Sequence, residues 1–299
     1  MIALRVAALA VLYFVCFTAV AAALLPPAPG VPPASDPVTA AWALLAMTAA
    51  NSVVIAYVVR RSRWSGWTLA TALWLVLYGV TTVMPQIETA FFITRLPPGM
   101  LPRLFLSGAI VTASISPIAV KLLGRWREGA DADAGDDAPR LRLTAGEWVV
   151  RLAIVVVAYL VLYFGFGYYV AWQSEAVRAY YGGVDPGSFA AQLRTVVRDT
   201  PLLVPLQVLR ALLWVAIAVP VIRMTTGPWW RAALCVALLF AVVMNTQLVL
   251  PNPYMPRDVR FAHLVETASS NFIFGWVLVA ALLWRRGGTP MRVAPATAA

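Results

Sequence analysis

Residues 152–171, LAIVVVAYLVLYFGFGYYVA, decide the fold class because they are twenty consecutive positions without a charged side chain. A helix rises about 1.5 Å per residue, so a run of this length crosses the roughly 30 Å hydrocarbon core of a bilayer. The whole chain has the same character, since 61% of its 299 residues are hydrophobic and 12% are charged. Soluble domains contain about 25% charged residues. The sequence therefore predicts an all-α, polytopic membrane helix bundle.

Seven other apolar runs reach a comparable length. Together they predict eight transmembrane helices, near residues 3–25, 38–60, 66–92, 103–124, 146–171, 201–223, 228–250 and 260–284. The N-terminal run is longer than the apolar region of a signal peptide, which spans about 7–15 residues. We therefore expect this run to remain as a span.

The basic residues predict which side of the membrane each loop faces. Alternating spans place 15 of the 23 Lys and Arg residues on the side of the N-terminus and seven on the other side, with Arg210 inside a span. Short loops rich in Lys and Arg stay in the cytoplasm. We therefore predict a multi-pass protein of the bacterial plasma (inner) membrane with both termini in the cytoplasm. The net charge of +10 then reflects topology, and we expect no nucleic-acid partner.

The first four spans resemble the last four. A shift of 162 residues aligns Arg61 with Arg223, and a shift of 155 aligns residues 112–114 with residues 267–269, both Thr-Ala-Ser. Because four is an even number, two such copies enter the membrane in the same direction. The sequence therefore predicts two parallel four-helix repeats.

This duplication sets the expected domain boundaries. They are an N-terminal repeat at 1–125, a cytoplasmic acidic linker at 126–144, a C-terminal repeat at 145–286 and a cytoplasmic tail at 287–299.

Several kinds of site are excluded by counting. The chain has a single histidine and two cysteines, Cys16 and Cys235, both within apolar runs. These numbers exclude a multi-histidine zinc site, a disulfide framework and a CxxC motif. No P-loop, HExxH or GxSxG motif occurs. We expect neither a metal nor another cofactor, and no motif identifies a family.

Polar side chains inside the predicted spans are the candidate site. Charged groups in spans are rare and usually face a cavity or a partner. Glu88, Arg210 and Glu266 all fall in the outer half of their spans. Helical spacing adds His263 beside Glu266. The candidate substrate-binding or proton-handling residues of the resulting outer-leaflet cavity are Glu88, Arg210, His263, Glu266, Gln86, Gln207, Ser270 and Asn271.

A purely structural role explains the same residues. Arg210 could be neutralised by Glu88 or Glu266, which would hold two helices together without a ligand. His263 on a polar helix face could equally be a hydrogen-bonded packing residue. Both interpretations stay open at this point.

The longest predicted outer loop, at about 171–200, carries two features. Phe189, Leu193, Val196 and Val197 recur at helical spacing, which predicts a short helix at the membrane surface. The tyrosines and tryptophan at 168–181 are typical of an interfacial belt, with a lid hinged at Gly182 as the alternative.

Three functions fit this pattern. The first is a transporter or lipid-handling carrier in which Arg210 binds an anionic small molecule or lipid. The second is a membrane-embedded enzyme that acts on a lipid-soluble substrate, with His263 as base and Glu266 as its orienting acid. The third is a non-catalytic subunit or assembly factor whose buried charges bind a partner membrane subunit. Membrane lipids are partners in every case.

Overall fold

The computed structural model describes residues 1–25, 35–93, 96–126 and 141–284. The predicted proline-rich outer loop at 26–33, most of the acidic linker and the C-terminal tail lie outside the described residues. Within the described ranges the chain is helical, and its only β-type pairing is one isolated bridge between Ser62 and Thr225. The prediction of an all-α fold is therefore confirmed.

Eight segments, each of 21 to 27 residues, are long and apolar enough to cross a membrane. Five of them are continuous helices: α1 (Ile2–Leu24), α2 (Pro37–Arg60), α5 (Met100–Leu122), α9 (Leu203–Met224) and α11 (Arg257–Leu283). All eight agree with the predicted spans to within three residues at each end. The length of the apolar runs was thus sufficient to locate the helices.

The other three segments each contain a helix of a different pitch. The third consists of α3 (Gly66–Tyr78), the π-helix η1 (Gly79–Val83) and α4 (Met84–Phe92). The fifth consists of α6 (Ala145–Phe166) and the π-helix η2 (Gly167–Ala171). The seventh consists of α10 (Trp229–Leu238), the π-helix η3 (Leu239–Val243) and the 3₁₀ helix η4 (Asn245–Val249). Hydropathy does not reveal such turns, which occur frequently at functional sites.

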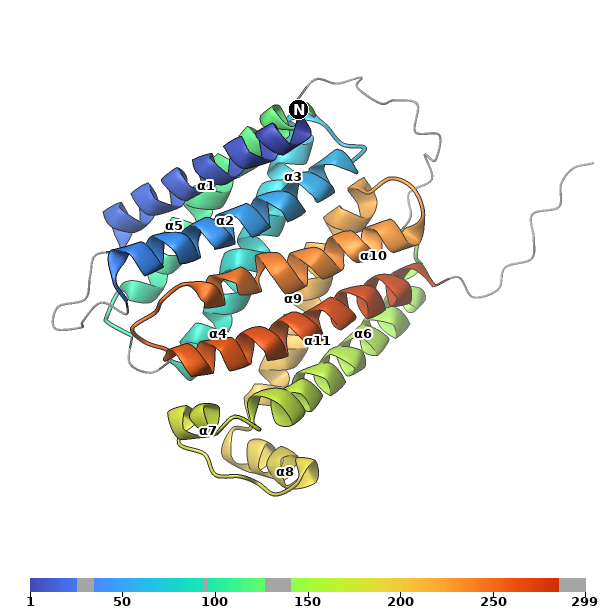
Figure 1. Cartoon of the computed structure of the whole chain (residues 1–299). Helices are drawn as coiled ribbons and strands as arrows, with labels where there is room; N and C mark the ends of the chain where they lie inside the picture. Colours follow the sequence, from blue (N-terminus) through green and yellow to red (C-terminus); the bar gives the residue numbers. More distant parts are fainter. Residues whose placement is uncertain (26–34, 94–95, 127–140, 285–299) are drawn as a thin grey trace, which may run out of the picture.

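The helices form two groups that pack against each other (Figure 1). In the N-terminal half, defined as residues 1–126, α5 packs against both α1 and α3. In the C-terminal half, defined as residues 141–284, α11 packs against α6 and α10 in the same way. Between the halves α3 contacts α9, α2 contacts α10, and η1 contacts η3.

Glycines allow close helix contacts in this core. A Cβ on Gly275 of α11 would lie 2.6 Å from the Cα of Ala237 in α10. A Cβ on Gly79 would lie 2.8 Å from the Ile217 side chain of α9. At Gly275 the obstructing atoms are backbone, so α11 and α10 approach each other because glycine is present, whereas at Gly79 the end of the Ile217 side chain could move.

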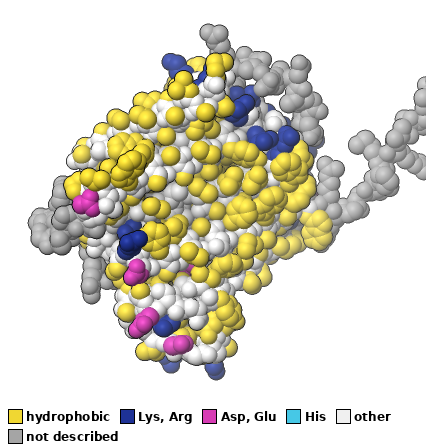
Figure 2. Space-filling view, viewed as in Figure 1, with side chains coloured by type: hydrophobic (Ala, Val, Ile, Leu, Met, Phe, Trp, Pro, Cys, Tyr) yellow, Lys and Arg dark blue, Asp and Glu magenta, His cyan; other side chains and the backbone are white. Residues whose placement is uncertain are grey.

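The outside of the bundle is apolar. Val157 and Val161 of α6 are 60% and 65% exposed, and large apolar side chains are exposed on the other outer helices as well. Figure 2 shows a broad hydrophobic surface on the visible face, with charged side chains gathered towards the two ends of the bundle. A soluble monomer rarely exposes such a continuous apolar surface, so the face is suited to lipid.

Two short helices lie beyond the end of the bundle opposite the N-terminus (Figure 1). α8 (Phe189–Asp199) has no buried residue, and it coincides with the helix predicted from its apolar spacing. α7 (Glu175–Tyr181) was not predicted, and it ends at Gly182, whose φ of 68° is left-handed. We refer to this side of the molecule as the α7–α8 end.

Candidate polar site at the α7–α8 end

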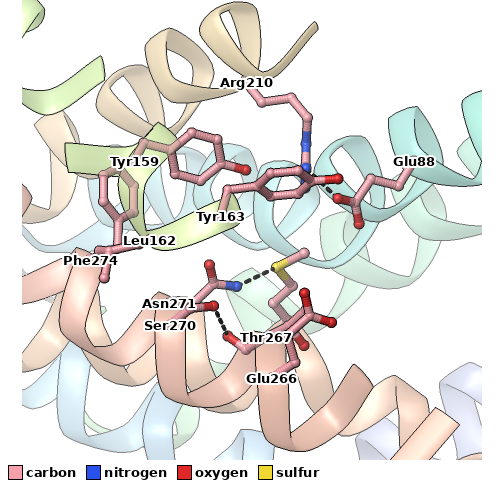
Figure 3. Close-up of a pocket in the computed structure, with 11 residues that line it drawn as sticks. Glu88, Tyr159, Leu162, Tyr163, Arg210, Glu266, Thr267, Ser270, Asn271 and Phe274 are labelled. Carbon is pink, nitrogen blue, oxygen red and sulfur yellow. Dashed lines mark hydrogen bonds and ion pairs between the residues drawn. The ribbon is translucent and has the colours of Figure 1, made fainter. Parts of the chain in front are cut away.

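A small cavity brings most of the predicted polar residues together (Figure 3). The volume available to the centre of a water molecule is about 20 Å³, so the cavity has room for a single water. Its lining residues are Glu88, Tyr159, Leu162, Tyr163, Arg210, Met244, Glu266, Thr267, Ser270, Asn271 and Phe274. Glu88 comes from the N-terminal half and every other residue from the C-terminal half.

Arg210 is the buried cation of this cavity. It lies in the third turn of α9 and is 2% exposed, and its guanidinium forms an ion pair with Glu88 of α4. The same Nη1 donates to Gln207 Oε1 at 2.8 Å, one helical turn earlier on α9. The Arg210 Nε has no hydrogen-bond partner among the described residues. The sequence left two acids as partners for Arg210, and the structure selects Glu88.

Gln207 connects the ion pair to α6. Its Oε1 also accepts a hydrogen bond from the Tyr159 hydroxyl at 3.2 Å, while its Nε2 is buried without a partner. Gln207 itself is fully buried. It therefore orients Arg210 and Tyr159 from behind rather than lining the cavity.

Glu266 lies on the other side of the cavity, on α11, away from the Arg210–Glu88 pair (Figure 3). Its Oε2 is 2.7 Å from Nδ1 of His263, which precedes it by one turn. The Nε2 of His263 is in turn 3.1 Å from the Tyr181 hydroxyl of α7. A neutral imidazole satisfies both contacts if Nδ1–H donates to Glu266 and Nε2 accepts from Tyr181.

Tyr181 closes this chain of hydrogen bonds from outside the spans. Burial raises the pKa of its phenol above the usual range, so the hydroxyl stays protonated and available as a donor at neutral pH. Its ring stacks against Trp172 and meets His263 edge-on. α7 is thereby attached to α11 directly above the cavity.

The remaining polar wall is formed by α11. Ser270 donates to the Thr267 carbonyl at 3.3 Å, and the Asn271 amide contacts the Met244 sulfur at 3.3 Å. Thr267 donates to Asn245 Oδ1 at 2.5 Å. The Thr267 and Asn271 contacts hold α11 against the seventh span, while the Ser270 bond stays within α11.

Of the eight predicted residues, five line this cavity: Glu88, Arg210, Glu266, Ser270 and Asn271. Gln207 and His263 contact lining residues without lining it themselves. Gln86 differs, because it lines a separate cavity in the N-terminal half. Gln86 and Glu88 are two positions apart in α4, about 200° around the helix, so they face nearly opposite sides and cannot line the same cavity.

Sequence reasoning missed the aromatic wall of the cavity. Tyr159 and Tyr163 are four residues apart on the most apolar span, which places them on one helix face. That spacing was a usable signal. The sequence gives no signal for Met244 and Phe274, because they are ordinary apolar residues in apolar helices.

The site holds two carboxylates, one guanidinium and one imidazole within a largely water-excluded space. Among the described residues, no group of three His, Cys, Asp or Glu side chains could hold a metal ion. The arrangement can exchange protons through Glu266 and His263, and it can bind an anion at Arg210 when Glu88 withdraws. A scan against models of known protein families found no match, and comparisons with curated proteins and with solved structures found none either.

Proposed function

We propose that the chain is an integral membrane carrier that binds an anionic small molecule, or the anionic head group of a lipid, at Arg210 on the outer side of the bacterial inner membrane. The observation that carries the proposal is the excess of acid around one arginine. Arg210 is neutralised by Glu88, yet a second carboxylate, Glu266, is 8% exposed nearby. A structural ion pair requires only one acid, so the second carboxylate, which contacts His263 and not Arg210, is left for another role.

The two acids then have different roles. Glu88 is 27% exposed at its side chain whereas Arg210 is 2% exposed, so Glu88 is the partner that can leave. An anionic ligand takes the place of the Glu88 carboxylate, because a guanidinium binds carboxylate and phosphate groups in the same geometry.

Glu266 supplies the proton exchange in this proposal. Its hydrogen bond to His263, and that of His263 to Tyr181, form a continuous path from the cavity to α7. Because the cavity has room for a single water, the ligand enters only after α7 moves away from α11.

The proposed scaffold for the carrier is a pair of parallel repeats, with the cytoplasmic termini predicted from the basic residues. The matching helix contacts of the two halves support it. So does the antiparallel bridge between Ser62 and Thr225, since it joins the aligned loops as a twofold axis requires. Pairing the first span with the fifth, at a shift of 146 residues, places Arg151 opposite Arg5. Arg5 lies beside Gly124 just after α5, and Arg151 donates to carbonyl groups at the end of α11.

Native mass spectrometry of the purified chain tests the anion site. Dioleoylphosphatidylglycerol and inorganic phosphate are the two added probes, one for a lipid source and one for a soluble source. We expect wild-type protein to retain one of them and Arg210→Gln to lose at least tenfold in affinity, because it lacks the guanidinium. Arg198→Gln is the matched control, since Arg198 is exposed on α8 and pairs with Asp199.

The Glu88→Gln variant adds a second test to the same experiment. The variant removes the carboxylate that competes with the ligand, so its affinity for the retained probe should exceed that of wild type at pH 8. Binding of neither probe by wild-type protein, or equal binding by Arg210→Gln, would contradict the proposal.

A catalytic role has one specific observation in its favour. The 2.7 Å contact between Glu266 and His263 is the geometry of a base oriented by an acid. Chemical conversion of a membrane lipid by the purified chain, lost in His263→Gln, would favour the enzyme over the carrier.

A further inference from the structure

A second and larger cavity lies in the N-terminal half. It has about 80 Å³ open to water centres, compared with about 20 Å³ for the first cavity. Its lining residues are Tyr13, Phe17, Val20, Ala21, Leu25, Met47, Thr81, Thr82, Gln86, Leu104, Ser107, Gly108, Val111, Thr112 and Gln247. It therefore extends along α1 towards the α7–α8 end.

The two walls of this cavity have different chemistry. Aliphatic and aromatic groups of α1, α2 and α5 form one wall, represented by Phe17, Met47 and Leu104. Hydroxyl and amide groups form the other, where η1 and α4 meet α5. Among the described residues that line the cavity, none carries a charge at neutral pH. A ligand in this space must accordingly be amphipathic and uncharged.

The hydroxyl hydrogens of the polar wall are already used. Thr81 donates to the Leu77 carbonyl at 2.8 Å, Thr112 to the Gly108 carbonyl at 2.7 Å and Ser107 to the Leu104 carbonyl at 3.0 Å. What these side chains present to the cavity is therefore the lone pairs of their oxygens. The Thr82 hydroxyl lies 3.4 Å from the Thr81 oxygen, which can accept from it because Thr81 donates to Leu77, and the Tyr13 phenol interacts with Asn51.

Gln86 leaves one acceptor unused. Its Oε1 is buried and has no hydrogen-bond partner among the described residues. The other lining amide, Gln247, is engaged, because its Nε2 donates to the Thr81 carbonyl at 2.7 Å. A buried carbonyl oxygen without a partner costs about 1–3 kcal/mol, and a ligand that donates a hydrogen bond removes this cost.

We propose that this cavity is a second binding site, which takes a long-chain alcohol: an uncharged hydroxyl that donates to Gln86 Oε1, joined to a single hydrocarbon or isoprenoid chain along α1 and α5. The narrow space and the apolar wall favour a single chain over a fused ring system. The site does not involve Arg210, so the proposal is tested separately from the carrier proposed above.

Photo-crosslinking of the full chain in neutral detergent tests this site. The probes are hexadecan-1-ol with a diazirine in its chain and the methyl ether of the same molecule, which cannot donate a hydrogen bond. We expect the alcohol to label peptides of α1 and α5 about fivefold more than the ether, which is the size of one neutral hydrogen bond. Gln86→Leu should reduce labelling by the alcohol to the level of the ether.

A second pair of variants keeps the test valid if Gln86→Leu folds poorly. Ala21→Trp fills the cavity from α1, whereas Ala22 is exposed on the lipid side of the same turn, so Ala22→Trp leaves the cavity open. Labelling should be lost in the first and kept in the second. Equal labelling by alcohol and ether, or undiminished labelling of Ala21→Trp, would overturn the proposal.

Discussion

The two cavities occupy corresponding places in the two halves but differ in charge. One lies between α6, α9 and α11, and the other between α1, α2 and α5. Each also receives a side chain from the third span of the opposite half, which is Glu88 in the first cavity and Gln247 in the second. Similar helix packing therefore supports an ionised site in one half and a neutral site in the other.

The difference in charge between the two cavities is due to single residues. The shift that aligns the loops of the two halves places Thr48 of α2 opposite Arg210 of α9. Thr48 is fully buried and donates to the Leu45 carbonyl at 3.1 Å, so it needs no partner from another helix. Arg210 does need one. The charge of the first cavity is thus a property of a few side chains and not of the fold.

The largest expected change in unfolding free energy comes from removing the counter-charge in the charged cavity. Glu88→Leu leaves the Arg210 guanidinium buried without a counter-charge, which should cost about 3 kcal/mol of unfolding free energy. Gln247→Leu in the neutral cavity should cost about 1 kcal/mol, because only one neutral hydrogen bond is lost. Thermal unfolding in detergent, followed by tryptophan fluorescence, measures both.

The double variant Glu88→Leu/Arg210→Leu is the control for that prediction. Removing both charges should restore most of the lost stability. If the double variant is as unstable as the single one, the ion pair is not the source of the difference between the cavities.

The next effect compares the helix contacts of the two halves. A Cβ on Gly275 would strike the backbone of Ala237, whereas a Cβ on Gly108 would strike the Thr82 side chain. Gly275→Ala should therefore cost about 2 kcal/mol, a typical overpacking penalty. Gly108→Ala should be partly rescued by Thr82→Ala, which removes the obstructing hydroxyl and methyl groups. Thermal unfolding checks this, with Gly165→Ala as a control at a position where a Cβ has open space.

A smaller effect concerns α7, which has no counterpart over the neutral cavity among the described residues. Tyr181→Phe keeps the ring but removes the hydrogen bond to His263, so opening of α7 should become about fivefold more frequent. Hydrogen exchange of residues 175–181 measures this opening. Tyr169→Phe is the control, because Tyr169 is 66% exposed. Unchanged exchange in Tyr181→Phe would show that α7 is not held by this bond.

The smallest effect is local to the start of α2. The Thr39 side chain, followed by the Thr39 and Val38 amides, hydrogen-bonds to the Asp36 carboxylate and lowers its pKa. A lowered pKa stabilises the folded helix end above the pKa of the unfolded chain, and the contribution is lost as the pH falls through the folded value. The exchange rates of the amides at residues 38–40, relative to the intrinsic rates of an unfolded chain at each pH, should therefore rise in acid. Asp36→Asn, which keeps the cap without titrating, should not show the rise.

The fold was predictable because bilayer thickness fixes the length of an apolar run. The site was predictable in part, because charges inside spans are rare enough to identify Glu88, Arg210 and Glu266 singly. Which acid pairs with Arg210 was not predictable, since that depends on how helices from the two halves meet. The separation of Gln86 from Glu88 could have been predicted, because residues two positions apart lie about 200° apart around an α-helix.

The π-helices also make the site sensitive to the number of residues in the chain. Relative to an α-helix, a π-turn contains one additional residue, so everything beyond it is rotated by about 100°. Glu88 follows η1 and Gln247 follows η3, and both point across the interface into the other half. Deleting one residue from η1 would turn Glu88 away from Arg210 without changing any side chain of the site. The contact on which the charged cavity depends is therefore set by the number of residues in η1 as well as by the side chains themselves.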